Sequence, residues 1–403
     1  MGEATEIKAA LRTRNITYAV RDIVVLANQV AQQGMEMLYL NIGDPNQFDF
    51  QTPEHIVEAT YRAMLANMNG YSPSSGIKEA LEAIEEQASA KGIGNILDIF
   101  ITTGASEAID ICFTALVNEG ENLLTPTPGY PLYPAILNKL GARLNPYYLD
   151  ESNGWQPNLE DIASKIDGET RGILLINPNN PTGSVCTEQT LQGIIKLALE
   201  HNLVIFADEI YDKLLLDDDE HISIASLDRD VSVVTFNGLS KAYLVPGFRI
   251  GWGVVSGRRA VMGEYLEAIN KLLRARLCAN HPEQHAIKPA LQGDQGHLEQ
   301  VKAKLSRRRD ITTEMLNAIP GISCVPPKGA FYAFPRLNIE GSDDHFVRQL
   351  IKETGVVVVP GSGFGQEPGS KHFRVVFLPP EEVLKAAYAK IASFYEKYMD
   401  AGS

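Results

Sequence analysis

Short apolar segments alternate with amphipathic segments through the middle of this chain, and this alternation limits the folds open to it. The apolar, strand-like runs cover residues 99–102, 122–125, 172–176, 203–207, 231–236 and 251–255. Segments with helical periodicity lie between them, at residues 106–117, 159–165 and 191–201. Such alternation predicts an α/β fold in which a mostly parallel sheet lies between helices.

The length of the chain and a change of pattern near residue 295 predict two domains. A chain of 403 residues exceeds the size at which a single hydrophobic core keeps growing. Beyond residue 295 a charged helical stretch leads into an α+β pattern, with the helix at 298–319 and strands near 330–335, 356–359 and 373–377. We expect a large domain over residues 49–295 and a smaller α+β domain built from residues 1–48 and 296–403.

Composition and charge argue against several classes of protein. With 44% hydrophobic and 21% charged residues, the chain has the composition of an ordinary globular protein. Its formal net charge of -14 repels phosphate backbones and anionic lipids, so we expect neither nucleic acid nor membrane as a partner. The four cysteines form no C-x-x-C pair and the acidic run 217–220 stands alone, so we expect no metal site. The absence of a secretory signal predicts the cytoplasm as location.

Lys241 and Arg249 follow the apolar run 231–236, where a parallel sheet is expected to bind ligands. An amine at a buried strand end with an arginine one loop away suits an imine-forming lysine beside a phosphate anchor. Taken alone, the pair also fits a solvated surface lysine and a loop cation, which are far more common. Further segments are therefore needed to decide between the two interpretations.

Two turns upstream have the form of ligand-binding loops. Residues 102–110, Thr-Thr-Gly-Ala-Ser-Glu-Ala-Ile-Asp, end a strand and start a helix that Ser106 could cap, which suits either an anion site or plain helix capping. Residues 125–131, Thr-Pro-Thr-Pro-Gly-Tyr-Pro, form a proline-stiffened loop that holds Tyr130. The ring of Tyr130 can stack on a flat heterocycle or fill the core.

The loops after the next two strands are more specific. Residues 177–183, Asn-Pro-Asn-Asn-Pro-Thr-Gly, predict an irregular turn whose side-chain amides point inward. Asp208 directly follows the apolar run 203–207, so its carboxylate is expected at a buried strand tip. A carboxylate in such a place is costly unless a cation or several donors meet it, and a protonated pyridine nitrogen would be one such partner.

In order and spacing these motifs resemble the class I/II aminotransferases, the pyridoxal-phosphate (PLP) enzymes of fold type I. The resemblance rests on the Asn177 turn, Asp208-Glu-Ile-Tyr, Ser240-Lys241 and Arg249-Ile-Gly, and extends from Asn41-Ile-Gly-Asp-Pro to the region of Arg374. Within the family, Asn237-Gly-Leu-Ser-Lys-Ala-Tyr and Arg276-Leu-Cys-Ala-Asn are most similar to the alanine aminotransferases. The resemblance implies a large domain with a mostly parallel sheet, a smaller α+β domain and PLP as the cofactor.

The resemblance also implies the roles of the residues around the PLP ring. Lys241 would hold PLP as an imine and move the proton between the substrate Cα and the cofactor, so its pKa must be lowered. Asp208 would pair with the pyridinium nitrogen. Tyr211 and Asn180 would donate hydrogen bonds to the 3′ oxygen, and Tyr130 would stack on the ring.

The phosphate and the substrate carboxylate have their own expected partners. Arg249, Ser106 and the backbone N–H of Ala105 would bind the phosphate, although Gly238 stands where many relatives carry a serine ligand. Tyr71 would reach the phosphate from a neighbouring subunit, which implies a homodimer. The substrate site is implied for three residues and shares Asn180 with the cofactor: Arg374 for the α-carboxylate, Gly43 for a close backbone approach, and Tyr18 to close over the substrate.

The activity implied is transfer of an amino group between an L-amino acid, expected to be alanine, and a 2-oxo acid such as 2-oxoglutarate or pyruvate, with ping-pong kinetics. A β-eliminating C–S lyase, or an aminotransferase for aspartate or aromatic side chains, shares most of these residues and stays open. A DNA-binding regulator would need a basic helix-turn-helix domain ahead of the cofactor domain. A nicotinamide-binding protein would need a G-x-G-x-x-G turn after the first strand, and the chain has none there.

Overall fold

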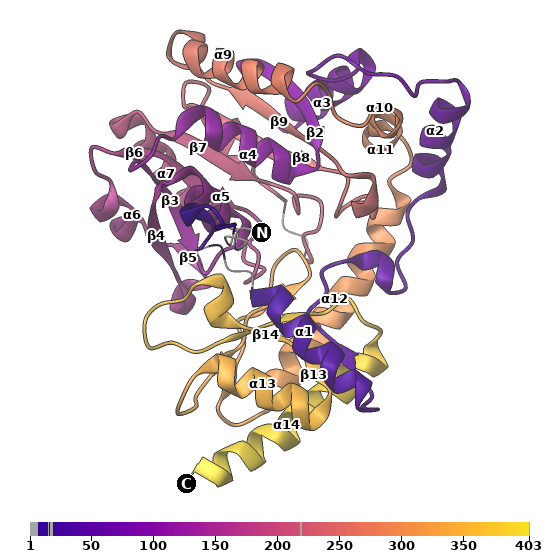
Figure 1. Ribbon diagram of the computed structural model, residues 1–403, viewed down its shortest axis with the longest axis vertical. Coiled ribbons are helices and arrows are strands. Elements are labelled where there is room, and N and C mark those ends of the chain that lie inside the picture. Colours follow the sequence, from indigo (N-terminus) through magenta and orange to yellow (C-terminus); the bar gives the residue numbers. More distant parts are fainter. Residues whose placement is uncertain (1–6, 15, 17–18, 218–219, 403) are drawn as a thin grey trace, which may run out of the picture.

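The computed structural model describes residues 7–14, 16, 19–217 and 220–402, and its upper half in Figure 1 is a helix-covered sheet. The sheet has eight strands in the order β2-β9-β8-β7-β6-β3-β4-β5. The strands are β2 (Ile96–Thr103), β3 (Asn122–Thr127), β4 (Arg143–Asp150), β5 (Gln156–Pro157), β6 (Thr170–Ile176), β7 (Val204–Asp208), β8 (Val233–Gly238) and β9 (Ile250–Ser256). Only β9 and β5 run against their neighbours, so the predicted α/β fold with a mostly parallel sheet is confirmed.

Helices cover both faces of this sheet. They include α3 (Lys78–Ala90), α4 (Ala105–Leu116), α5 (Leu132–Leu140), α6 (Leu159–Lys165), α7 (Glu188–His201), α8 (Ile224–Leu227) and α9 (Arg259–Ala275). Beside the sheet, α2 (Glu54–Leu65), α10 (His281–Gln284) and α11 (Ile287–Gln292) pack on one another and on α3 (Figure 1). Neighbouring strand residues point to opposite faces: Phe206 joins the apolar cluster under α4 and α9, and Ile205 joins the cluster under α3 and α7. Because both faces are covered, β7, β8 and β9 are buried throughout, which explains their continuous apolar sequence.

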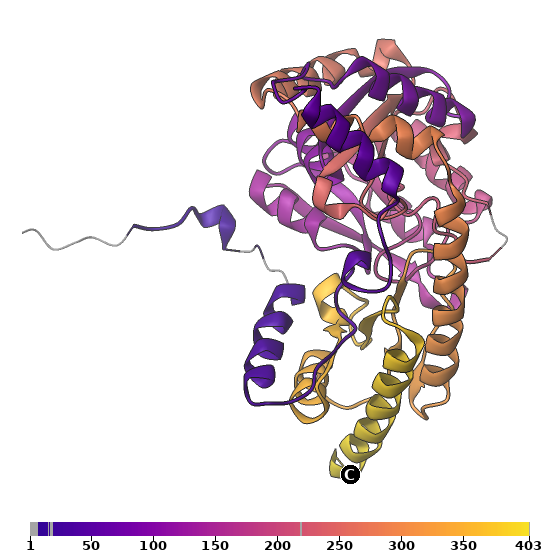
Figure 2. The same cartoon turned by 90° about the vertical axis from the view of Figure 1, so that its right-hand side faces the viewer.

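The C-terminal third forms a second layer of helices and small sheets together with the N-terminal segment. Its helices are α1 (Ala19–Gln32), α12 (Gly296–Asn317), α13 (Asp343–Thr354) and α14 (Glu381–Gly402), and its strands are β1 (Leu38–Tyr39), β10 (Ile322–Ser323), β11 (Tyr332–Ala333), β12 (Arg336–Leu337), β13 (Val356–Val357), β14 (Val359–Pro360) and β15 (Phe373–Val376). Figure 2 shows α12 and α14 side by side. Strand β1 pairs with β13 and α1 packs on α13, so the N-terminal segment returns to this part of the chain.

Three local predictions differ from the structure. Strands β4 and β5 were not predicted, because residues exposed on one face interrupt the apolar pattern of β4 near the sheet edge. The expected strand at 330–335 is only the two residues of β11. The suggestion that Ser106 caps its helix is wrong: α4 begins at Ala105, and its N-cap is Gly104 at φ 78°, without a side-chain cap bond.

Short 3-10 turns complete the fold at η1 (Leu11–Thr13), η2 (Pro45–Gln47), η3 (Glu151–Asn153), η4 (Pro246–Phe248) and η5 (Gly361–Phe364). Among the residues that the structure describes, no helix has the length and apolar character needed to cross a bilayer. The division into domains at residues 48 and 295 stays a prediction.

Candidate active site

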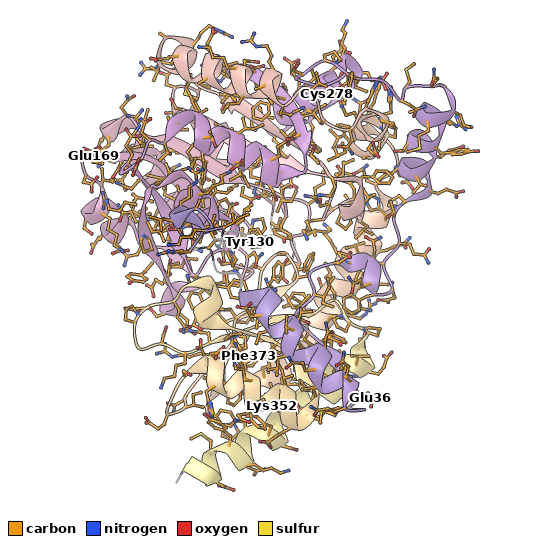
Figure 3. The ribbon with its side chains drawn as sticks, in the orientation of Figure 1. Glu36, Tyr130, Glu169, Cys278, Lys352 and Phe373 are labelled. Carbon is orange, nitrogen blue, oxygen red and sulfur yellow. The ribbon has the colours of Figure 1, made fainter. Side chains whose placement is uncertain are left out.

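A cavity of about 380 Å³ lies at the carboxyl ends of the parallel strands, where the large sheet faces the C-terminal part of the chain. Figure 3 labels Tyr130 in this central region, between the helices of the sheet and α1. The cavity brings together ten of the predicted site residues: Gly43, Ala105, Ser106, Tyr130, Asn180, Asp208, Tyr211, Lys241, Arg249 and Arg374. Residues from seven separate segments of the chain therefore converge on one space.

Lys241 projects into the cavity from the turn that follows β8. Its Nζ donates a hydrogen bond of 2.9 Å to the backbone carbonyl of Gly43, in the loop after β1. Burial lowers the pKa of Lys241 to about 8, and the charges of Arg374 and Arg249 act in the same direction, while Asp44 and Asp208 oppose them. About a tenth of the amine is therefore neutral at pH 7, far more than for an ordinary lysine, and a nucleophile or general base requires this form.

Asp208 ends β7 and is 7% exposed. Burial raises the pKa of its carboxyl, while hydrogen bonds from the Tyr133 hydroxyl and from the backbone N–H of Ile210 act in the opposite direction. Within the described part of the chain these donors are its partners, and no lysine or arginine forms an ion pair with it. A cationic ring nitrogen would supply the charge that a buried carboxylate needs.

The Asn177 turn after β6 divides its side chains between structure and cavity. Asn177 accepts a bond from the Cys186 backbone, and Asn179 accepts bonds from the backbone and hydroxyl of Thr182, so both hold the turn. Asn180 instead faces the cavity, where its Oδ1 accepts a bond of 3.2 Å from Arg374. Of the amides predicted to point inward, those of Asn177 and Asn179 stabilise the turn and that of Asn180 faces the cavity.

Arg374 lies on β15 and is 4% exposed, so the interpretation as a surface cation at a strand edge does not hold. Besides Asn180, its guanidinium donates 3.0 Å to the backbone carbonyl of Asn41. Two aromatic rings contact the guanidinium, with centroids at 4.8 Å for Tyr332 and 4.5 Å for Phe364. A planar cation held in this way can bind a carboxylate through two parallel hydrogen bonds.

The N-terminus of α4 and Arg249 form the anion-binding end of the cavity. Ala105 and Ser106 occupy the first turn of α4, where backbone N–H groups and the helix dipole favour negative charge. Arg249 lies close to the turn at Gly104: a Cβ on Gly104 would collide with its guanidinium, which explains the glycine there. The close approach places a guanidinium beside free helix N–H groups, an arrangement suited to a phosphate.

The segment Asp208–Asp212 is also fixed by Lys91, which pairs with two of its acidic side chains. Lys91 at the end of α3 forms ion pairs with Asp212 and, at 3.4 Å, with Glu209. Both carboxylates are at most 3% exposed. Burial alone would lower the pKa of Lys91 and raise that of Asp212, but the attraction outweighs it and shifts both pKa values in the opposite directions. This cluster anchors the segment that presents Asp208 and Tyr211.

Two predicted site residues are not placed in the cavity. Tyr71, in the loop after α2, is 82% exposed and lies outside the cavity lining. Tyr18 lies outside the described residues. Arg276 also stays out of the lining, because it donates to the backbone carbonyl of Ile101 at 2.6 Å and pairs with Glu107.

The structure adds residues to the site that the sequence analysis missed. Tyr332 lines the cavity, and its hydroxyl lies 2.8 Å from that of Tyr211. Tyr133, in the first turn of α5, donates a hydrogen bond to Asp208. Lys91 and Phe364 gave no local signal, because each reaches its partner only through the fold.

Comparison with known proteins agrees with this geometry. Residues 35–391 match the family model "Aminotransferase class I and II", and the chain belongs to this family. The fold is that of fold type I: an aspartate aminotransferase structure from Thermus thermophilus, 28% identical, superposes with a TM-score of 0.88 over 96% of this chain and 100% of that chain. The chain is therefore an aminotransferase.

The more similar relatives carry narrower names. The chain is 40% identical to glutamate-pyruvate aminotransferase AlaA of Escherichia coli (strain K12), over 97% of this chain and 98% of that protein. It is 39% identical to an alanine aminotransferase of Mycobacterium tuberculosis (strain H37Rv), over 96% and 92%. The structure of an alanine aminotransferase from Pyrococcus furiosus is 40% identical with a TM-score of 0.93, covering 97% of this chain and 100% of that one.

Proposed function

We propose that this aminotransferase uses PLP to move an amino group between L-alanine and 2-oxoglutarate, with pyruvate and L-glutamate as the products. One observation carries the proposal: a lysine with a pKa of about 8 shares a cavity with a buried carboxylate and a buried arginine. The relatives named as alanine and glutamate-pyruvate aminotransferases support the choice of substrates.

The residues of the cavity fit PLP at each of its polar groups. Asp208 would hold the ring nitrogen, since its buried carboxylate has hydrogen-bond donors but no ion pair among the described residues. Ala105, Ser106 and Arg249 would hold the phosphate. Tyr211 and Asn180 would hold the 3′ oxygen, and Tyr130 would stack on the ring, as its place in the lining permits. When bound, PLP supplies an electron sink and carries the amino group between the two substrates.

Lys241 is proposed to act twice on this cofactor and its substrate. As a neutral amine it would hold the cofactor, and once the substrate amine has displaced it, it would take the proton from the substrate Cα. The bond from its Nζ to the Gly43 carbonyl supports this role, because it directs the amine toward the loop that closes the substrate side of the cavity.

Arg374 would orient the substrate by its α-carboxylate, with Asn180 beside it and the backbone at Gly43 close by. Lys241 lines the same cavity, so a substrate held by this clamp would lie in the space that the amine enters. Apolar side chains in the lining, including Val24, Ile42 and Leu132, suit a methyl side chain and exclude water from the reacting groups.

We also propose a homodimer, and a large domain at 49–295 with a small one from 1–48 and 296–403. Helix α2 and the loop after it carry an apolar surface of five residues: Val57, Tyr61, Met64, Leu65 and Met68, each at least 43% exposed. A patch of this kind suits an interface, and a second copy bound there would receive Tyr71 at its phosphate end. Tyr18 would close over the substrate. The four cysteines lie unpaired, in keeping with a cytoplasmic location.

A spectroscopic and product test decides the activity. Purified protein with PLP should show a visible absorption band that L-alanine abolishes, releasing one equivalent of pyruvate, and that 2-oxoglutarate restores. L-Aspartate and L-phenylalanine serve as the specificity controls. Release of pyruvate and ammonia from cysteine-type substrates without any 2-oxo acid would establish the β-eliminating lyase instead, and absence of the band would refute the cofactor.

A further inference from the structure

Tyr332 links the two ends of the cavity through one hydroxyl and one ring. It lies on β11, is 2% exposed, and its hydroxyl oxygen is 2.8 Å from that of Tyr211, which follows β7. The two residues are 121 positions apart in sequence, so only the packing of the small sheet against the large one brings them together. Both residues are buried, with Tyr211 3% and Tyr332 2% exposed.

The position of the Tyr332 hydroxyl is fixed from a second direction by Gly43. A Cβ on Gly43 would lie 2.7 Å from that oxygen, so the glycine permits the close approach. The carbonyl of the same glycine accepts the 2.9 Å bond from Lys241. The Tyr332 hydroxyl is thus held between the loop that meets Lys241 and the Tyr211 side chain.

The ring of Tyr332 contacts the guanidinium of Arg374, with 4.8 Å between the guanidinium carbon and the ring centroid. Phe364 makes a similar contact at 4.5 Å but has no hydroxyl. A cation over an aromatic face is attracted and held in one plane. The same ring also meets the Tyr211 ring edge-on, with 5.7 Å between centroids. Phenylalanine at position 332 would keep both ring contacts and remove the hydroxyl alone.

The direction of the hydrogen bond follows from counting protons. A tyrosine hydroxyl has one proton to donate and lone pairs to accept with. If Tyr211 donates its proton to the 3′ oxygen of PLP, as the proposed function requires, the proton between the two tyrosines must come from Tyr332. We propose that Tyr332 is a positioning residue that donates to Tyr211 and stacks on Arg374, coupling the cofactor end of the cavity to the carboxylate end.

This arrangement has a spectroscopic consequence. A hydroxyl that accepts a hydrogen bond becomes a stronger donor, so Tyr332 strengthens the bond from Tyr211 to the negative 3′ oxygen. The 3′ oxygen gains most from this bond when the nitrogen that joins Lys241 to the cofactor has lost its proton. Tyr332 therefore lowers the pH at which the visible band of the bound cofactor titrates.

The test is a pH titration of the visible band in PLP-loaded Tyr332→Phe, Tyr211→Phe and the double variant. We expect the midpoint to rise for Tyr211→Phe, to rise by ~0.3 unit or more for Tyr332→Phe, and to rise no further in the double variant than in Tyr211→Phe. Fluorotyrosine at position 332, a stronger donor of nearly the same shape, should shift the midpoint downward, and it keeps the test available if Tyr332→Phe fails to fold.

Phe364→Leu is the matched control for the ring. It removes the ring contacts with Arg374 and Phe334 but leaves the hydroxyl pair of Tyr332 and Tyr211 in place, so it should raise the KM for L-alanine about 3- to 10-fold without moving the midpoint. Tyr332→Phe keeps its ring and should leave that KM within about twofold. Tyr332→Leu should change both quantities.

The outcomes separate this inference from the proposed function on which it rests. A shifted midpoint in Tyr211→Phe with a wild-type midpoint in Tyr332→Phe would overturn the role of Tyr332 and leave the function intact. An additive shift in the double variant would also overturn it. An unshifted midpoint in Tyr211→Phe would refute the assigned contact of Tyr211, and a protein without a visible band would refute the PLP enzyme itself.

Discussion

The two sides of the cavity are assembled in different ways. On the large-sheet side, Asp208 ends β7 and Lys241 follows β8 by three residues, so adjacent parallel strands deliver both. On the other side, Arg374 binds the carbonyl of Asn41, 333 positions away in the sequence. The first side depends on local strand geometry and the second on the return of the N-terminal segment. We therefore expect substitutions on the first side to change the chemistry, and substitutions on the second to change substrate binding.

The largest effect is expected for Lys241→Ala. Loss of the amine removes both the cofactor attachment and the proton transfer, so L-alanine turnover should fall by ~10³-fold or more while PLP still binds. Borohydride reduction followed by peptide mapping should find the adduct at Lys241 in the wild type and none in the variant. Lys271→Ala, at an exposed position of α9, is the control. An adduct at any other lysine would contradict the assignment.

Lys91→Met tests whether the ion pairs of Lys91 with Glu209 and Asp212 stabilise the large-sheet side. Removing the cation leaves two buried carboxylates unpaired, so the free energy of unfolding should fall by about 3–5 kcal/mol in denaturant titrations. Lys78→Met, on the same helix but exposed, should change it by less than ~0.5 kcal/mol. Adding Glu209→Gln and Asp212→Asn to Lys91→Met should recover part of the loss.

The same pair has a defined pH dependence. Lys91 lowers the pKa of Asp212 below its ordinary value of 3.8, so the ion pair stabilises the fold above that pH. Its contribution is lost as the pH falls further and Asp212 becomes protonated. The stability difference between wild type and Lys91→Met should therefore shrink below pH 3.8, and a constant difference would exclude the ion pair as its cause.

Arg374→Lys tests the second side of the cavity. The lysine keeps the charge but loses the planar pair of donors, so the KM for L-alanine and for 2-oxoglutarate should rise on the order of 10- to 100-fold. Because Lys241, Asp208 and Arg249 are unchanged on the large-sheet side, the visible absorption band should keep its intensity. Arg348→Lys, at an exposed position of α13, should match the wild type. A lost band with unchanged KM would reverse the assignment of the two sides.

The smallest effect is the pH dependence of PLP uptake by the cofactor-free protein. Because burial lowers the pKa of Lys241 to about 8, the neutral amine accumulates as the pH rises through that value rather than through 10.5. Stopped-flow absorbance should show the association rate rising with pH with a midpoint near 8. A midpoint at the ordinary lysine pKa would mean that burial does not perturb the amine, and would weaken the first side of the comparison.

The sequence predicted most of the large-sheet side, because each of its residues follows a strand that could be recognised. The buried strands β6 and β7 have continuous apolar runs, and the Asn177 turn and Asp208 come directly after them. Strand β4 could not be recognised, since exposed residues on one face interrupt its pattern. The prediction that Ser106 caps α4 was wrong because Gly104, at positive φ, is the N-cap and the helix begins at Ala105.

By itself, the sequence determined the alternation of strands and helices and the polar residues that end each strand, since both depend on local periodicity and on turn chemistry. Only the tertiary structure decided which distant groups complete the site: the Lys91 anchor, the Tyr332 hydroxyl beside Tyr211, and the rings around Arg374. Such contacts depend on how the C-terminal layer packs against the large sheet. A packing arrangement of this kind leaves no periodic signal along the chain.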